Sequence, residues 1–410
     1  MRRRHFLCSS LAALTGSRIS SLTFAADAPQ SRDHLLVVLF LRGGCDGLHL
    51  LGPANDKDYI AARPEWLRVT ESGKFEGLAL KNGFNGVDMR LHKEAGALKE
   101  LYDSGHLAMV HACGLQNGTR SHFEAQDMME RGVADQKDIS VASGWLTRTI
   151  EALSPRGLLP AVAVGGELPD SLLHSKVAVS MTEACDFNYG HERQVALLKR
   201  LYEGRESIHR TGKLTLDTIT ALQTKLPRDG DGNVQDYAPE KGVSYEDIGG
   251  LGDSLRSLAQ IAKMDAGLRV ATVDYDGWDT HESQEYRFNE QVSELSRALA
   301  AFYNDMSRFH SKMTIVVHTE FGRRLKSNQS EGTDHGYGGV HMVLGSGVKG
   351  GRLYGDWRGL ANEHLDEGAD LAITTDYRTL LTEVLTKRVG IDDVKSIFPG
   401  FEMKQALGIV

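Results

Sequence analysis

An uninterrupted apolar run at residues 35–41 constrains the fold more than any other feature of the sequence. It reads Leu-Leu-Val-Val-Leu-Phe-Leu, without the alternation of polar and apolar residues that a half-exposed strand shows. A strand that is apolar at every position is buried on both faces, which is typical of parallel sheets covered by helices. Similar runs recur along the chain and alternate with amphipathic stretches of helix length. This pattern predicts an α/β fold with a mainly parallel sheet.

The same pattern predicts where the other elements lie. Strands are expected at residues 107–111, 161–164, 269–275, 314–318 and 339–344. Helices are expected at residues 95–102, 254–266 and 284–310. Residues 211–243 contain two prolines and the sequence Asp-Gly-Asp-Gly, which predict a polar, flexible loop. We expect residues 29–410 to form a single α/β domain that contains this loop.

The first 28 residues have the pattern of an export signal. Arg2, Arg3 and Arg4 precede a short apolar stretch and the small residues Ala25 and Ala26. Consecutive arginines followed closely by Phe-Leu are typical of signals that the twin-arginine translocase recognises. We therefore expect that translocase to be a partner during export, with cleavage close to Ala26 and a periplasmic or extracellular location. No later stretch is apolar enough to predict a stable membrane span.

Charge and cysteine content exclude some function classes. The formal net charge is −8, and lysine and arginine are spread along the chain, so the sequence does not predict a nucleic-acid partner. Cys8 lies within the expected signal, and the other three cysteines are Cys45, Cys113 and Cys185. Their odd number and wide spacing predict neither a disulfide framework nor a zinc-finger site. We expect them to be small buried residues.

Metal-binding residue types follow several of the predicted strands. The candidate ligands are Asp46, Asp279, His281, Glu320 and His335, and His122 lies in a further polar loop. Ligands of open α/β sheets bind outside the carboxyl ends of the strands, so we expect these residues to converge there in one pocket. Imidazoles and carboxylates together suit a divalent ion such as zinc, manganese, iron or magnesium. Each residue also has a simpler interpretation, since Asp46 could belong to a turn and Glu320 could form a surface ion pair with Arg323.

Five motifs identify a family that the chain resembles. They are Phe40-Leu41-Arg42-Gly43-Gly44-Cys45-Asp46-Gly47-Leu48, Ser121-His122-Phe123-Glu124-Ala125-Gln126, Asp279-Thr280-His281, Thr319-Glu320-Phe321-Gly322-Arg323 and Gly332-Thr333-Asp334-His335-Gly336. From about residue 35 to the last residues, the chain resembles the exported bacterial proteins of the domain of unknown function 1501 family. That family is similar to the alkaline-phosphatase-like superfamily. The resemblance implies a three-layer α/β/α sandwich with a two-metal site and a Ser or Thr nucleophile.

The resemblance also implies roles for individual residues. Asp46 corresponds to the superfamily's first-strand metal aspartate. Asp279, His281 and His335 correspond to the ligands of one metal, although Asp279 and His281 are separated by one residue where the superfamily usually has three. Glu320 stands where the superfamily has the aspartate of an Asp-His pair. Because Phe321 follows it, the second metal lacks that histidine.

These assignments predict a metal-dependent hydrolase that acts on a phosphate or sulfate ester, with zinc or manganese as the cofactor. Ser121 and His122 are the expected catalytic residues, while Thr119 or a metal-bound water are alternative nucleophiles. Arg120 and Arg323 are expected to bind the anionic group of the substrate, because guanidinium matches tetrahedral oxyanions. The alternative function is a secreted binding or scaffold protein of the same fold that has lost catalysis. A simple serine hydrolase is disfavoured, because the chain has no Gly-x-Ser-x-Gly motif.

Overall fold

The computed structural model describes residues 33–410, except residues 136, 139–140 and 187–191, so the expected export signal lies outside the described residues. A nine-stranded sheet forms the centre of the described part. Its order is β13 (Leu353–Tyr354), β5 (Leu107–Gly114), β12 (Gly339–Leu344), β9 (Met313–His318), β1 (Leu35–Leu41), β8 (Val270–Tyr275), β6 (Ala161–Val164) and β7 (Ala178–Met181), with β16 (Thr375–Asp376) also paired to β5. Only β12 runs antiparallel to its neighbours, which confirms a mainly parallel sheet.

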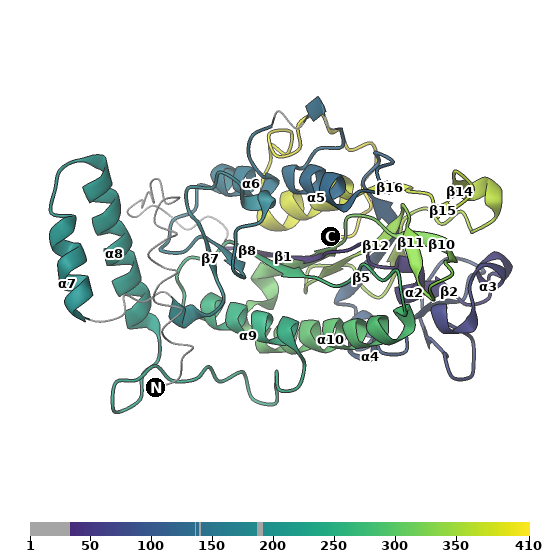
Figure 1. Ribbon diagram of the computed structural model, residues 1–410, viewed down its shortest axis with the longest axis horizontal. Helices are drawn as coiled ribbons and strands as arrows, with labels where there is room; N and C mark the ends of the chain where they lie inside the picture. The colour runs from purple at the N-terminus through teal and green to yellow at the C-terminus, as the bar shows by residue number, and fades with distance from the viewer. Residues whose placement is uncertain (1–32, 136, 139–140, 187–191) are drawn as a thin grey trace.

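Helices cover both faces of this sheet, as Figure 1 shows. One face carries α4 (Gly96–Asp103), α9 (Gly250–Lys263) and α10 (Gln284–Asp305), and the other carries α5 (His122–Arg131), α6 (Trp145–Leu153) and α11 (Tyr377–Val384). Successive residues of β1 belong to two different cores, since Val37 and Leu39 pack with one set of helices and Leu36 and Val38 with the other. The apolar run is therefore buried on both sides, as expected, and the three-layer α/β/α arrangement is confirmed.

Smaller elements surround the end of the sheet at which β1 and β9 terminate (Figure 1). They are α2 (Gly47–Leu50), α3 (Lys57–Ala62), the sheet of β2 (Leu51–Pro53), β4 (Met89–Leu91) and β3 (Leu78–Ala79), the hairpin of β10 (Arg323–Ser327) and β11 (Thr333–His335), and the hairpin of β14 (Leu365–Asp366) and β15 (Asp370–Leu371). Short helical turns lie at Glu65–Leu67, Asp170–Leu172, Ala184–Asp186, Ser307–Lys312, Asn362–His364 and Leu385–Val389.

The segment expected to be a loop at residues 211–243 is only partly irregular. Helix α8 (Ser207–Lys225) occupies its first half and pairs with α7 (Glu192–Leu201) at one end of the molecule (Figure 1). Leu216 and Leu222 are buried on α8, which gives this helix an apolar face. The prolines and the Asp-Gly-Asp-Gly sequence all follow residue 225, so the turn-forming residues act only on the second half.

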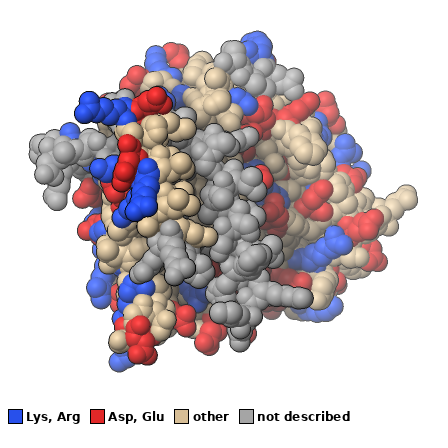
Figure 2. Space-filling model, turned by 60° about the vertical axis from the view of Figure 1, so that its left-hand side comes forward, with Lys and Arg blue, Asp and Glu red and all other residues tan. Residues whose placement is uncertain are grey.

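The described surface carries charges of both signs. On the face drawn in Figure 2, lysine and arginine lie among aspartate and glutamate. None of the helices in the described part of the chain combines the length and the apolar character needed to cross a membrane. Cys45 and Cys113 are buried and Cys185 is half-buried, and within the described residues none of the three forms a disulfide.

Candidate metal centre

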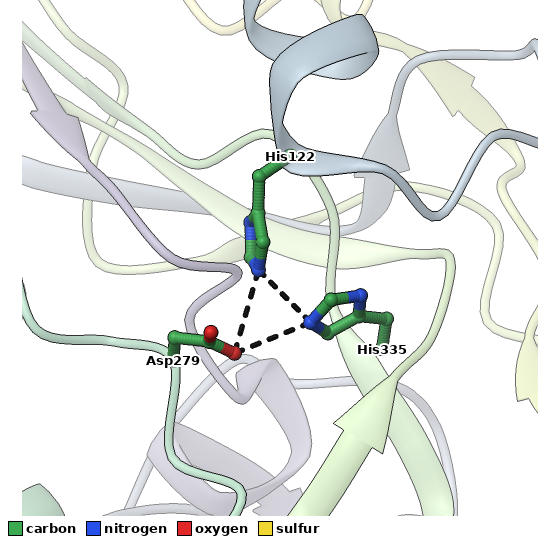
Figure 3. A group of neighbouring side chains, drawn as sticks. All are labelled: His122, Asp279 and His335. Carbon is green, nitrogen blue, oxygen red and sulfur yellow. Dashed lines mark hydrogen bonds and ion pairs between the residues drawn. The ribbon is translucent and has the colours of Figure 1, made fainter.

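Three histidines and one aspartate meet beyond the carboxyl ends of the central strands. His122 is the first residue of α5, Asp279 and His281 lie in the loop after β8, and His335 is the last residue of β11. The Nε2 atom of His335 lies 2.9 Å from Nε2 of His122 and 2.9 Å from Nε2 of His281. Oδ1 of Asp279 lies 3.2 Å from Nε2 of His335, 3.0 Å from that of His281 and 3.4 Å from that of His122. Figure 3 shows His122, Asp279 and His335 pointing toward one another. We call His122, Asp279, His281 and His335 the histidine cluster.

The other ring nitrogen of each histidine in the cluster contacts a group that can only accept a hydrogen bond. Nδ1 of His122 donates to Oε1 of Glu320 at 2.7 Å. Nδ1 of His335 donates to the carbonyl oxygen of Arg120 at 2.7 Å, and Nδ1 of His281 donates to Oδ1 of Asp334 at 3.0 Å. In a neutral imidazole one nitrogen carries the proton and the other carries a lone pair. These acceptors therefore assign the proton to Nδ1 and leave the lone pair on Nε2.

This assignment leaves two close contacts between ring nitrogens without a proton. When all three rings are neutral, the lone pair on Nε2 of His335 lies 2.9 Å from Nε2 of His122 and 2.9 Å from Nε2 of His281, with no hydrogen in either contact. A proton or a metal ion removes the repulsion. Tetrahedral zinc with bonds of about 2.0–2.1 Å holds its ligand atoms about 3.3 Å apart, close to the spacing of the cluster. Histidine ligands of metals usually donate their second N–H to a carboxylate or a carbonyl, as all three do here.

The charges around the cluster shift the pKa of its members in different directions. Burial lowers the pKa of His122, but the hydrogen bond and charge of Glu320 outweigh burial and raise the pKa above 6.5. Burial is the largest cause of the lowered pKa of His335. Burial also raises the pKa of Asp279, yet the hydrogen bond and charge of Arg323 hold that pKa at about 2. Asp279 is therefore an anion at neutral pH and is available to a cation.

The cluster is open to solvent on one side. The Asp279 side chain is 47 % exposed and that of His281 is 39 % exposed, whereas His122 is 19 % exposed. A ligand or a water molecule can therefore reach the cluster from the Asp279 side. The opposite side is closed by Phe321, whose ring packs 4.7 Å from that of His122 and 5.1 Å from that of His335.

Glu320, predicted as a metal ligand, lies behind His122. Its carboxylate is buried, and Oε1 accepts from Nδ1 of His122 at 2.7 Å, from Nε2 of Gln126 at 2.8 Å and from the backbone N–H of Gly43 at 2.8 Å. Oε2 lies 3.1 Å from Oγ1 of Thr319, whose single proton also has the carbonyl oxygen of Leu41 as an acceptor at 2.9 Å. Glu320 therefore contacts the cluster through the ring of His122.

Asp46, also predicted as a ligand, is bonded to Arg63. Arg63 donates to Oδ2 of Asp46 at 2.8 Å and to Oδ1 at 3.0 Å, and both side chains have an exposed fraction of 0 %. Gln284 donates to Oδ2 at 2.7 Å, and the backbone N–H of His49 donates to Oδ1 at 3.2 Å, where Asp46 caps α2. The carboxylate is thus neutralised and fully hydrogen-bonded by the protein itself.

Arg323, predicted to bind the substrate anion, is buried beneath the cluster. Its guanidinium donates to Oδ1 of Asp279 at 2.5 Å and to four carbonyl oxygens, those of Gly43, Gly44, Trp278 and Thr333. Its side chain has an exposed fraction of 0 %. The guanidinium thus joins the loops that carry the cluster, and its role in substrate binding stays a prediction.

The loops close tightly around this guanidinium. Gly43 has a φ of +116°, and a Cβ added there would lie 2.5 Å from the backbone N of Asp279. Only glycine allows the loop after β1 to approach the loop after β8 this closely.

Arg120 and Ser121 come directly before α5 in the sequence. The Arg120 side chain pairs with Asp370, Asp366 and Glu367 around the β14–β15 hairpin, and its role in substrate binding stays a prediction. Ser121 is the N-cap of α5, and its Oγ accepts a long hydrogen bond of 3.5 Å from the backbone N–H of Glu124. The spacing of Ser121 and Glu124 is a helix-start signal, and it places His122 in the first turn.

The structure brings together Asp279, His281 and His335, which the sequence suggested as ligands, and it adds His122, which the sequence suggested as a catalytic residue. It separates Asp46 from them by its pairing with Arg63. The sequence contained a signal for His122, because a histidine stands there at the start of a helix that follows a strand. Its partner Glu320 is 198 positions away, so sequence spacing could not reveal the pair.

No curated protein matches the chain. Among solved structures, it matches a protein in the alkaline phosphatase superfamily from Vibrio parahaemolyticus with 11% identity, covering 86% of this chain and 71% of that one, at a TM-score of 0.35. It also matches a phosphonate monoester hydrolase of Agrobacterium radiobacter with 9% identity, covering 91% and 78%, at a TM-score of 0.40. A sulfatase from Pseudoalteromonas matches with 11% identity, covering 86% and 68%, at 0.32.

These similarities are too low to transfer a site or an activity. The match to a family model is stronger evidence than these structural similarities, because it covers residues 33–399 of the chain. This range contains all five sequence motifs and the whole histidine cluster. The chain belongs to the family described as protein of unknown function (DUF1501).

Proposed function

We propose that the chain is an exported metal-dependent hydrolase that acts on a phosphate or sulfate ester. The observation that carries this proposal is the convergence of three imidazole Nε2 atoms and one carboxylate oxygen, with each Nδ1 bonded to an acceptor. His122, Asp279, His281 and His335 hold the metal. Mixed imidazole and carboxylate ligands suit zinc or manganese. A divalent ion bound there would lower the pKa of a water or hydroxyl and stabilise negative charge on the transferred group.

The side chains around the ion have distinct tasks in this proposal. Glu320, Asp334 and the carbonyl of Arg120 fix the rings so that the Nε2 lone pairs face the ion. Arg323 keeps Asp279 ionised and fixes the direction of its Oδ1 atom. The exposed side of Asp279 is where the ester group enters.

Ser121 is the side-chain nucleophile that the geometry favours over Thr119. Oγ1 of Thr119 donates to Oε2 of Glu124 at 2.7 Å and accepts from the backbone N–H of Ser121, so it is held by the protein. Oγ of Ser121 accepts one hydrogen bond of 3.5 Å and lies at the N-terminus of α5, where backbone N–H groups favour an anion. Water is the alternative nucleophile.

Metal analysis and ester hydrolysis together test this proposal. The wild-type chain should contain stoichiometric zinc or manganese and hydrolyse an aryl phosphate or an aryl sulfate. His335→Ala should lose metal and activity, whereas the exposed His364→Ala serves as the matched control and keeps both. Ser121→Ala should lose activity and keep its metal if Ser121 is the nucleophile, and keep activity if water is.

Two results would contradict the proposal in different ways. A wild-type chain without metal would remove the basis of the site. A metal-loaded chain that hydrolyses no phosphate or sulfate ester would favour the binding or scaffold protein.

We also propose that residues 1–28 direct export through the twin-arginine translocase. The support is the sequence pattern of Arg2, Arg3 and Arg4 before an apolar stretch. Replacing the three arginines by lysines keeps the positive charge and should retain the chain in the cytoplasm. Undiminished periplasmic accumulation of this variant would refute the route.

A further inference from the structure

The number of ions at the centre can be inferred from the residues beside the histidine cluster. The resemblance to the alkaline-phosphatase-like superfamily implies two metal ions. Asp46 and Glu320 were the predicted ligands that lie outside the cluster, and Phe321 replaces the expected histidine. If a second ion were bound, Asp46, Glu320 and Phe321 are the positions that would have to supply its ligands.

Asp46 has no lone pair left for an ion. Its four hydrogen bonds come from two donors on Arg63, one on Gln284 and one backbone N–H. Arg63 is fixed in turn by the carbonyl oxygens of Arg324 and Leu325, to which it donates at 2.8 Å each. Because both members of the ion pair are fully buried, an ion could replace Arg63 only by leaving a buried guanidinium unpaired.

The remaining two positions are also held by contacts within the protein. Three donors converge on Oε1 of Glu320, one of them the Nδ1–H of His122, and Oε2 lies 3.1 Å from Oγ1 of Thr319. Phe321 presents an aromatic ring to His122 and His335 and offers no ligand atom. A second ion would therefore meet hydrogen-bonded carboxylates and an apolar ring.

Two buried guanidinium groups supply fixed positive charge at these places. Arg63 neutralises Asp46, and Arg323 shares Oδ1 of Asp279 with the histidines. Nη1 of Arg323 lies 3.5 Å from Nε2 of His281, so its charge is adjacent to the cluster itself. Arginine stays protonated at every pH at which the protein is folded, and its charge cannot be removed by a chelator.

We infer that the centre takes a single divalent cation and that Arg63 and Arg323 stand in place of a second one. This inference rests on the proposed function, because it takes the histidine cluster to be the site of the first ion. The centre would then hold one metal ion beside two arginine side chains whose positive charge is permanent. Chelation should therefore remove the only exchangeable positive charge, that of the metal ion, in one step.

Native mass spectrometry of the folded wild-type chain, titrated with zinc and separately with manganese, tests the inference. Saturation at one ion per chain is the expected result. Two ions per chain would overturn the inference and leave the metal-dependent function standing. No bound ion would overturn the proposed function and the inference together.

Two substitutions locate the ion independently of the count. His335→Ala should weaken metal binding by more than about 100-fold, because a ligand is lost. Asp46→Asn should change the dissociation constant by less than about threefold, because Asp46 contacts Arg63 and not the ion. If Asp46→Asn weakens binding as strongly as His335→Ala does, Asp46 is a ligand and the inference fails. Should Asp46→Asn not fold, the ion count of the wild-type chain decides alone.

Discussion

Two groups of polar side chains near the end of β1 look alike in sequence and differ in structure. In the Asp46 group, every carboxylate oxygen is bonded to a protein donor, and Arg63 balances the charge. In the histidine cluster, Nε2 of His335 lies 2.9 Å from Nε2 of both His122 and His281 and 3.2 Å from Oδ1 of Asp279. The first group has its cation built into the chain, and we propose that the second takes one from solution.

This difference shows what separates a structural carboxylate from a candidate ligand. Burial accompanies this difference, since Asp46 and Glu320 are buried whereas the Asp279 side chain is 47 % exposed. The informative feature is the balance of donors against lone pairs. Removing a donor from the first group and a cation from the second should therefore have different effects.

The largest expected effect is the loss of Arg63. Arg63→Met leaves the buried Asp46 carboxylate without its counter-charge, which should lower the free energy of unfolding by about 3–5 kcal/mol. Chemical denaturation measures this change. The double variant Asp46→Asn with Arg63→Met should be less destabilised than the sum of the single variants. Additive effects would show that the two side chains do not interact and would break the comparison.

Removal of the ion from the histidine cluster should have the next largest effect. A ligand present at a thousandfold excess over its dissociation constant stabilises the folded state by about 4 kcal/mol. Chelation should therefore lower the melting temperature of the wild type. His281→Ala and His335→Ala should melt lower than the metal-loaded wild type and be insensitive to the chelator. A wild type that melts identically with and without chelator would mean that no cation is needed.

Glu320 connects the two kinds of site, since protein donors surround its Oε1 atom and one of these donors is the ring of a proposed ligand, His122. Glu320→Gln replaces the acceptor of His122 by a weaker one and should reduce metal affinity by about 10–100-fold. Competition with a coloured chelator gives the dissociation constant. The exposed Glu363→Gln is the matched control and should bind metal as the wild type does. Equal affinity in both variants would remove Glu320 from the account.

The smallest effect concerns a third group, in which Arg42 pairs with two carboxylates, Glu130 and Asp274. Burial raises the pKa of Glu130 from 4.5 to about 7, against the opposing effect of Arg42. A folded-state pKa above the unfolded value contributes stability below pH 4.5, and this stability is lost as pH rises through 7. Glu130→Gln should flatten that slope in melting experiments. An unchanged slope would show that Glu130 is ionised throughout.

Most of the fold could be predicted because it depends on local pattern. The continuous apolar runs gave β1, β6 and β12 their observed bounds, since strands buried on both faces have no polar positions. Helix α8 was missed because the turn residues after it dominated the interpretation of the whole segment. The antiparallel direction of β12 was not predictable, since direction depends on the path of the connection and not on strand composition.

The site was less predictable than the fold, because it depends on pairs far apart in the sequence. Residue type and position after strands were enough to suggest Asp279, His281 and His335. They could not show that Arg63 pairs with Asp46, or that Arg323 is held by carbonyl oxygens from three other segments. A carboxylate and its neutralising arginine look the same in sequence as a carboxylate that binds metal.

Anomalous X-ray diffraction from crystals of the zinc-loaded chain, measured at the zinc edge, tests the central claim most directly. The account predicts one peak per chain, about 2.0–2.2 Å from Nε2 of His122, His281 and His335 and from Oδ1 of Asp279. A peak beside Asp46 or Glu320, or no peak within the histidine cluster, would contradict it.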